Sequence, residues 1–206
     1  MTLESKETLV EEFRHKSILG AAMKVIARKG LSGATMQEIA DEAGIAKGTI
    51  YLYFPSREEL VEKAADFFFN ELLEHSRRAL ADEQPLADQL RGLVRTQLTF
   101  FDANQQFLRV YMAMKFGEDC AAEAKRRRRG RPQYQRYLEL LSGFLESAMR
   151  RGEVKRVEPA RLAAFFAEGV SAILMRRLEG AAPPAEQEGG WIVDLMLHGI
   201  ASRRRA

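Results

Sequence analysis

The heptapeptide KGTIYLY, which begins at Lys47, carries the side chains best suited to contact a charged polymer. The lysine supplies a cation for a phosphate, and Thr49 supplies a hydroxyl and a methyl group for a base edge. Tyr51 and Tyr53 add two hydroxyls that can hydrogen-bond to phosphates. Gly48 has no side chain, which lets this segment approach the backbone of a duplex. These residue types predict binding to DNA.

Groups that act as catalysts or metal ligands are sparse in this sequence. His15, His75 and His198 lie far apart, and none has a partner at metal-ligand spacing. Cys120 is the single cysteine and lacks a CxxC context, which favours an ordinary thiol and excludes an internal disulfide. No glycine-rich phosphate loop is present. We therefore predict a protein that is not an enzyme and that has no cofactor, metal or catalytic residue.

Charge is distributed unevenly along the chain. The 206 residues have a formal net charge of +3. Residues 1–60 contain eight basic residues (Lys or Arg) and nine acidic residues (Asp or Glu). Residues 123–161 contain twelve basic and five acidic residues. The segment assigned to DNA is therefore slightly acidic, and its affinity must come from a few placed side chains and helix N-termini.

Hydropathy argues against a membrane or secreted protein. No stretch approaches the roughly 18 uncharged apolar residues of a membrane span. The N-terminus, MTLESKETLVEEF, is charged and lacks the apolar run of a secretory signal. We expect a cytoplasmic protein without a membrane partner.

Two short helices in close succession must position the DNA-binding side chains. Thr35 and Glu38 form a capping box at the start of the first, and Gly44 ends it. The second begins at Lys47 and is stopped by Pro55. Such a tight turn is typical of a helix-turn-helix, in which the second helix lies in the major groove of DNA.

The rest of the chain is also predicted to be helical. Apolar residues recur at helix spacing, and no stretch alternates as a half-buried strand would. The expected fold is all-α, with about nine helices: a three-helix N-terminal helix-turn-helix domain and a larger helical domain. Breaks are expected at Gly130 and Pro132, within KRRRRGRP, and over the loop GAAPPAEQEGG. Beyond the two short helices, the main helices are predicted at 57–81, 85–103, 104–118, 134–149, 160–178 and 190–201.

Residues 14–60 resemble the DNA-binding domain of the TetR family of repressors. The matching phrases are ILGAAMKVIARKG, ATMQEIADEAGIAKGTIYLYF and PSREEL. The resemblance implies a DNA-binding domain over 1–56, with helices at 11–29, 36–43 and 47–53, and a ligand-binding and dimerisation domain over 57–206. Ala46 departs from the family, which often has a helix-capping serine there. The DNA contacts implied are Thr35, Gln37, Lys47, Gly48, Thr49, Tyr51, Tyr53 and Arg57.

The resemblance also implies a homodimer formed by the last two long helices. Their wide apolar stripes, with small residues among them, agree with a four-helix bundle between two copies, although the stripes also suit the core of one chain. The predicted interface residues are Leu162, Phe165, Gly169, Val170, Ile173, Ile192, Leu195, Met196 and Ile200.

Aromatic and methionine side chains are dense in the middle of the chain. They suit a largely apolar pocket for a small-molecule effector, and equally a plain helical core. The candidate pocket residues are Phe68, Phe100, Phe107, Tyr111, Met112, Tyr137, Phe144 and Phe166. The basic run 125–131 is interpreted as a solvated surface segment or as a guide for an anionic ligand such as an acyl-coenzyme A.

These features predict a regulator of transcription. It would be a repressor whose binding to operator DNA is modulated by the effector. Two alternatives remain open: a constitutive DNA-binding protein without effector, and an all-helical small-molecule-binding protein. A cavity in the middle region, or its absence, distinguishes the sensor from the constitutive protein.

Overall fold

The computed structural model is helical throughout the part of the chain that it describes. It describes residues 3–81, 84–106, 108–109, 120–180 and 183–199, with the side chains of 3–9, 31–32 and 120–131 left out. Within these residues there are eight helices and no strand. The all-α fold expected from the sequence is confirmed. Among the described residues, no helix combines the length and apolar character needed to cross a bilayer.

The chain divides into two compact units, and two helices, α4 (Arg57–Ala81) and α7 (Cys120–Arg150), contribute residues to both. The first unit holds Met1–Asn70 and Gln105–Arg129, and the second holds Glu71–Asn104 and Gly130–Ala206. Helix α4 (Arg57–Ala81) starts at the first residue of the predicted larger domain and contributes to both units.

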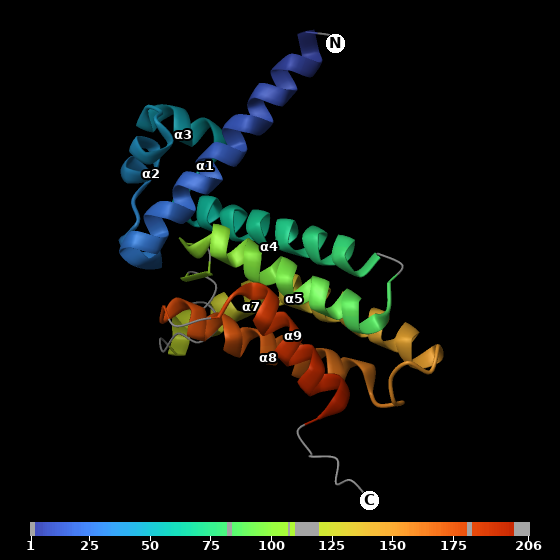
Figure 1. Ribbon diagram of the computed structural model, residues 1–206. Coiled ribbons are helices and arrows are strands. Elements are labelled where there is room, and N and C mark those ends of the chain that lie inside the picture. Colours follow the sequence, from blue (N-terminus) through green and yellow to red (C-terminus); the bar gives the residue numbers. More distant parts are fainter. Residues whose placement is uncertain (1–2, 82–83, 107, 110–119, 181–182, 200–206) are drawn as a thin grey trace, which may run out of the picture. The chain divides into compact units, whose positions relative to one another are not determined.

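In the first unit, α2 (Met36–Ala43) packs against α1 (Leu3–Gly33), and α3 (Lys47–Tyr53) packs against α2. The N-terminal stretch of α1 extends beyond both (Figure 1). The α1 helix begins earlier than the predicted residue 11, because residues 3–10 contain no helix-breaking Gly or Pro. Gly30 has a φ of 78° and interrupts the helical conformation at the predicted stop.

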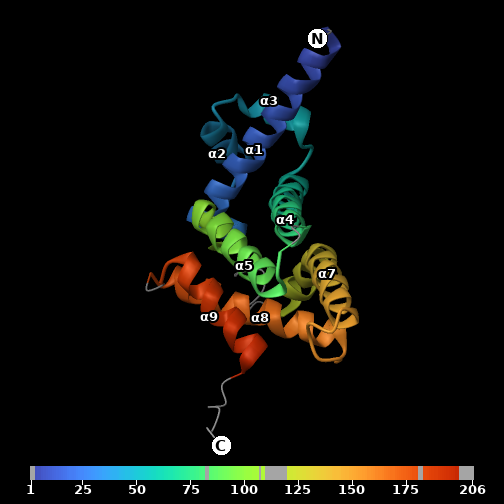
Figure 2. The ribbon, with the colours of Figure 1, turned by 45° about the vertical axis from the view of Figure 1, so that its right-hand side comes forward.

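The second unit is built around α5 (Leu86–Ala103), α8 (Pro159–Leu178) and α9 (Ala185–His198), which pack against one another (Figure 2). Leu90, Leu93, Val94 and Leu98 of α5 are fully buried at helix spacing. Gly189 lies close to α5 where α9 crosses it. A Cβ built at Gly189 would be 3.4 Å from the carbonyl oxygen of Arg91.

Two predicted breaks were wrong. Helix α7 runs without interruption from Cys120 to Arg150, through Gly130 and Pro132. A proline removes one backbone hydrogen bond, and the residues on either side of it continue the helix. Helix α9 begins at Ala185, inside the predicted loop, because Pro184 stands directly before its first turn. The predicted helix over 104–118 lies largely outside the described residues.

Candidate nucleic-acid interface

Helix α2 starts at a capping box, as the sequence predicts. The backbone N–H of Glu38 donates to Oγ1 of Thr35 at 3.3 Å, and the backbone N–H of Thr35 donates to Oε2 of Glu38 at 3.2 Å. These bonds satisfy donors that a helix N-terminus leaves open. Gly44 ends the helix in the left-handed region, with a φ of 68°, and turns the chain toward α3.

Helix α3 is held to the domain by its apolar side. Ile50 and Phe54 are buried, at 0% and 1% exposure. The N-cap residue Ala46 makes no side-chain hydrogen bond, so the missing serine does leave this helix without a side-chain cap. The bounds of α2 and α3 agree with the predicted 36–43 and 47–53.

The opposite side of α3 is open to solvent. Lys47, Gly48 and Tyr51 lie there together, which brings together three of the residues predicted to contact DNA. The fourth member of this face is Leu52, whose exposed fraction is 83%. Sequence reasoning missed it, because a leucine in a helical apolar pattern is ordinarily assigned to the core. We call Lys47, Gly48, Tyr51 and Leu52 the outer face of α3.

Thr49 and Tyr53 lie instead on the flank of α3 that turns toward α1. Both are half-buried. The ring of Tyr53 lies 5.6 Å from that of His15 in α1, and His15 also contacts the ring of Phe54 at 4.7 Å. A groove of about 410 Å³ follows this flank. Its lining residues are Phe13, Arg14, Ser17, Ile18, Ala43, Ile45, Ala46, Thr49 and Tyr53.

The predicted contacts on α2 are exposed, and each is engaged within the helix. Thr35 Oγ1 lies 3.0 Å from Glu38 Oε2 in the capping box. The amide Nε2 of Gln37 donates to Oδ1 of Asp41 at 2.8 Å. A contact between Gln37 and DNA would therefore exchange an existing surface hydrogen bond for a new one.

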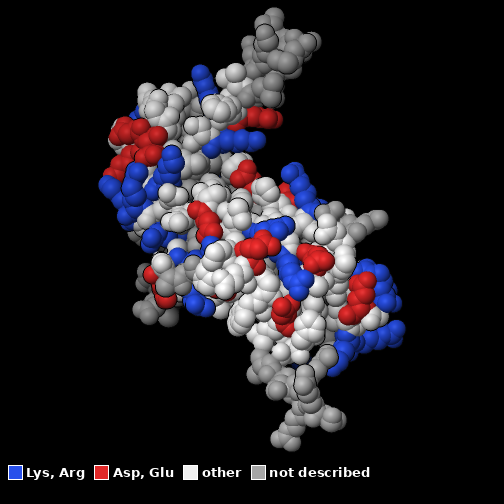
Figure 3. Space-filling model, viewed as in Figure 1, with Lys and Arg blue, Asp and Glu red and all other residues white. Residues whose placement is uncertain are grey.

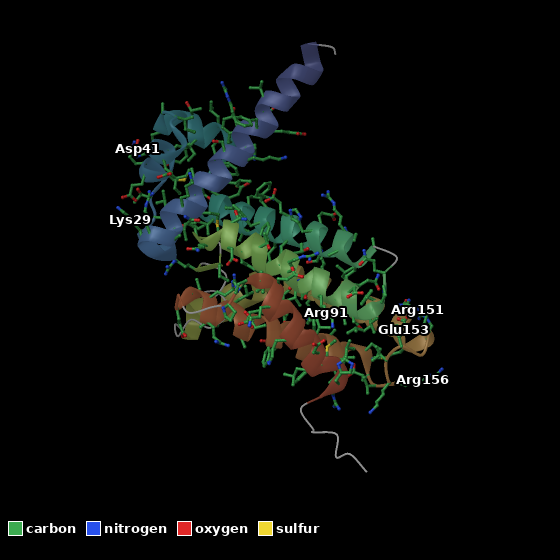
Figure 4. The ribbon with its side chains drawn as sticks, in the orientation of Figure 1. Lys29, Asp41, Arg91, Arg151, Glu153 and Arg156 are labelled. Carbon is green, nitrogen blue, oxygen red and sulfur yellow. The ribbon has the colours of Figure 1, made fainter. Side chains whose placement is uncertain are left out.

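Ion pairs between α1 and α2 set the charge around the site. Lys29 hydrogen-bonds to Glu38, and Arg28 Nη2 lies 2.8 Å from Glu42 Oε2. The hydrogen bond from Lys29, followed by those from Thr35, holds the pKa of Glu38 below its ordinary value of 4.5. Acidic and basic side chains lie side by side over this part of the surface (Figure 3), with Lys29 at the end of α1 near Asp41 of α2 (Figure 4).

The side chain of Arg57 is directed toward the loop before α2, within the first unit. Its Nε donates to the carbonyl oxygen of Ala34, and Nη1 lies 3.5 Å from Oε1 of Glu58. Among the described residues, no hydrogen-bond partner is found for its buried Nη2. The predicted phosphate contact would require this side chain to leave, or to share, its bond to the backbone.

The predicted pocket residues are only partly described. Phe107, Tyr111 and Met112 lie outside the described residues, and Phe68 belongs to the first unit. In the second unit, Phe100 and Phe166 are buried, and Tyr137 and Phe144 are half-buried.

A buried polar pair in the second unit was not foreseen. Gln97 Nε2 donates to Ser76 Oγ at 3.2 Å, and Ser76 Oγ donates to the carbonyl oxygen of Leu72 at 2.8 Å. These bonds satisfy polar groups that would otherwise be costly to bury. The single sequence carries no signal for the pair, because Ser76 and Gln97 come together only when α4 and α5 pack.

The predicted dimer residues fall into two groups. Val170, Ile173 and Ile192 are buried within the single chain. A Cβ at Gly169 would lie 2.9 Å from Cδ1 of Ile192, so this glycine leaves room for the end of the Ile192 side chain against α8. Leu162, Leu195 and Met196 are half-buried, Phe165 is 68% exposed, and Ile200 lies outside the described residues.

Comparison with known proteins agrees with this helix-turn-helix. Residues 18–64 match the model for bacterial regulatory proteins of the tetR family. The HTH-type transcriptional regulator YfiR of Bacillus subtilis is 30% identical over 161 residues, which cover 74% of each chain. The chain spans about half the length of some other curated relatives. One is an HTH-type transcriptional regulator from Haemophilus influenzae, which is 30% identical; the match covers 51% of this chain and 54% of that protein.

Solved structures share the fold. FadR of Bacillus subtilis, in complex with stearoyl-CoA, matches with a TM-score of 0.78 at 18% identity, over 90% of this chain and 98% of its own. AibR, in complex with isovaleryl coenzyme A and operator DNA, matches with a TM-score of 0.68 at 20% identity, over 89% and 98%. With the capped helix-turn-helix and the identity to YfiR, these findings place the chain in the TetR family of bacterial regulatory proteins.

Proposed function

We propose that this chain is a dimeric regulator of transcription that binds operator DNA through α3. The outer face of α3 carries the proposal, because it presents a lysine, a tyrosine hydroxyl and an apolar side chain to solvent beside a glycine. One helix fits the width of a major groove, and these side chains match its phosphates and base edges. The family supports this use, and AibR is described with operator DNA.

A dimer is proposed because two recognition helices are needed to read two half-sites about one duplex turn, ~34–36 Å, apart. In the single chain, α8 leaves Phe165 68% exposed and Met175 37% exposed, and α9 leaves Trp191 58% exposed. Large apolar side chains on neighbouring helices suit burial against a second copy.

The proposed effector is largely apolar, and acyl thioesters of coenzyme A are the class that we favour. FadR and AibR are both described with such ligands. The run KRRRRGR at 125–131 adds a concentration of positive charge to α7, of the sign that would attract the phosphates of coenzyme A.

The proposed mechanism is a shift between two conformations. Helix α4 contributes residues to both compact units, so an effector that displaces it in the second unit alters the first. The effector must bind the two conformations unequally, since a ligand of equal affinity shifts no population.

The test is binding of the full-length chain to the intergenic DNA beside its own gene, with random DNA as competitor and salt concentration varied. Selective binding by a dimer supports the regulator. Weak, salt-sensitive binding to all DNA means that the intergenic DNA does not contain the operator. Selection of binding sites from random duplexes then decides whether the chain prefers any sequence.

The effector is tested on the same complex with stearoyl-CoA and isovaleryl-CoA, and with free coenzyme A as the matched control. Release of DNA by an acyl-CoA but not by coenzyme A supports the proposed ligand class. Acyl-CoA binding without any change in DNA affinity contradicts the mechanism. Selective DNA binding that responds to no acyl-CoA contradicts this ligand class and leaves the constitutive alternative favoured.

A further inference from the structure

Leu52 is the most exposed of the large apolar side chains in the described part of the chain, at 83%. A single exposed leucine is common on protein surfaces. Its position is not ordinary, because it lies on the one side of α3 that is turned away from the domain. Ile50 and Phe54, by contrast, are almost completely buried. The apolar residues of α3 are therefore divided between core and solvent.

The neighbour of Leu52 one helical turn earlier is Gly48. A Cβ built at Gly48 would meet no atom within 4 Å, so packing within the chain does not require a glycine there. Glycine is also unfavourable inside a helix relative to alanine. Its effect at this place is to remove bulk from the outer face, next to Leu52.

The partner of an exposed leucine on a recognition helix follows from the chemistry of the major groove. Base pairs present donors and acceptors there, and the C5-methyl group of thymine is the apolar feature. Leucine cannot exchange hydrogen bonds with donors or acceptors, and it gains by removing a methyl group from water. Tyr51 and Lys47 supply the polar contacts on the same face.

We propose that Leu52 is a specificity residue that packs against a thymine methyl group in each operator half-site, with Gly48 providing the clearance that lets it reach the base. This inference rests on the proposed DNA-binding function and names one base within that function. The operator then contains a thymine at the position that faces Leu52.

The experiment begins with selection of preferred sites from random duplexes by the wild-type chain. Each thymine of the selected site is then replaced singly by uracil, which removes only the C5-methyl group. For the wild type we expect one position per half-site at which uracil raises Kd about fourfold, equivalent to ~0.8 kcal/mol for one buried methyl group. Leu52→Ala is expected to bind thymine and uracil at that position equally.

Three outcomes are distinguished by this design. Loss of uracil sensitivity in Leu52→Ala at one position, with sensitivity elsewhere retained, supports the inference. A selected site that shows no such position, or one at which Leu52→Ala remains as sensitive as the wild type, overturns the inference and leaves the DNA-binding function standing. Failure of the wild type to enrich any sequence overturns the proposed function and the inference with it.

Two further variants keep the result independent of folding. Val157→Ala shortens another exposed apolar side chain, 50% exposed and in the second unit, and is expected to bind as the wild type does. Gly48→Ala is expected to retain or raise the melting temperature and yet to weaken binding to the selected site. Unchanged affinity in a folded Gly48→Ala variant would overturn the role of Gly48 in clearance.

Discussion

Arg57 and Ala34 are joined by a hydrogen bond from the guanidinium Nε to the backbone carbonyl oxygen. Arg57 is the first residue of α4, and Ala34 immediately precedes the N-cap of α2. The bond therefore holds the loop before α2 to the start of α4, within the first unit. The Arg57 side chain is 28% exposed, which agrees with a structural role.

Replacing Arg57 by alanine is expected to destabilise the first unit. A hydrogen bond from a charged donor contributes about 1.5–3 kcal/mol to the free energy of unfolding. Urea denaturation followed by circular dichroism measures this loss, and DNA titrations at several salt concentrations measure phosphate contacts. Unchanged stability combined with a salt slope reduced by roughly 0.9 would instead support the phosphate contact expected from the sequence.

The ion pairs between α1 and α2 predict how the domain responds to acid. The pKa of Glu38 is lowered by the hydrogen bonds from Lys29 and Thr35, and that of Glu42 by the hydrogen bond from Arg28. Because the folded-state pKa values lie below the unfolded value of 4.5, the stabilisation is complete above 4.5. It is lost as the pH falls through the folded-state values.

We therefore expect the melting temperature of the first unit to drop as the pH falls below 4.5. Glu38→Gln retains a capping side chain and removes the ion pair, so its melting temperature should depend less on pH. Glu12→Gln changes an exposed carboxylate of α1 and is the matched control. Equal acid sensitivity in the wild type and in Glu38→Gln would show that Glu38 is not responsible.

Lys47 and Thr49 are expected to differ in their effects on DNA binding. Lys47→Ala should weaken binding to every sequence and reduce the salt slope by roughly 0.9, because one phosphate contact is lost. Thr49→Ala should change sequence preference more than the salt slope, and its effect should be small because Thr49 is half-buried beside α1. A large loss of affinity for random DNA in Thr49→Ala would contradict this division.

Two variants of α8 separate dimerisation from folding of the single chain. Phe165→Glu places a charge at a side chain that is 68% exposed, so the protomer should stay folded and the dimer should dissociate. Ile173→Glu places the same charge at a residue that is only 3% exposed, so this variant should unfold the protomer. Sedimentation and circular dichroism measure both properties. A fully dimeric Phe165→Glu variant would exclude this side chain from the interface.

Local capping chemistry explains how much of the first unit could be predicted from the sequence. Thr35 with Glu38 marks the start of α2, and Gly44 marks its end. Ser56, whose Oγ accepts from the backbone N–H of Glu59 at 3.2 Å, marks the start of α4. Each of these signals acts within three or four residues, so no tertiary information is needed to read it. The helix-turn-helix and its family resemblance follow from the same short-range pattern.

Which side of α3 faces solvent was decided only by the tertiary structure. The sequence predicts DNA contacts at Thr49 and Tyr53 as well as at Lys47 and Tyr51. Packing leaves Thr49 and Tyr53 half-buried beside α1, and it leaves Leu52 exposed beside Lys47 and Tyr51. The Arg57 bond to Ala34 also depends on the surrounding fold, because the two residues are 23 positions apart in the sequence. Residue types determine what a side chain can bind, whereas the packing of distant segments determines which side chains remain available to bind it.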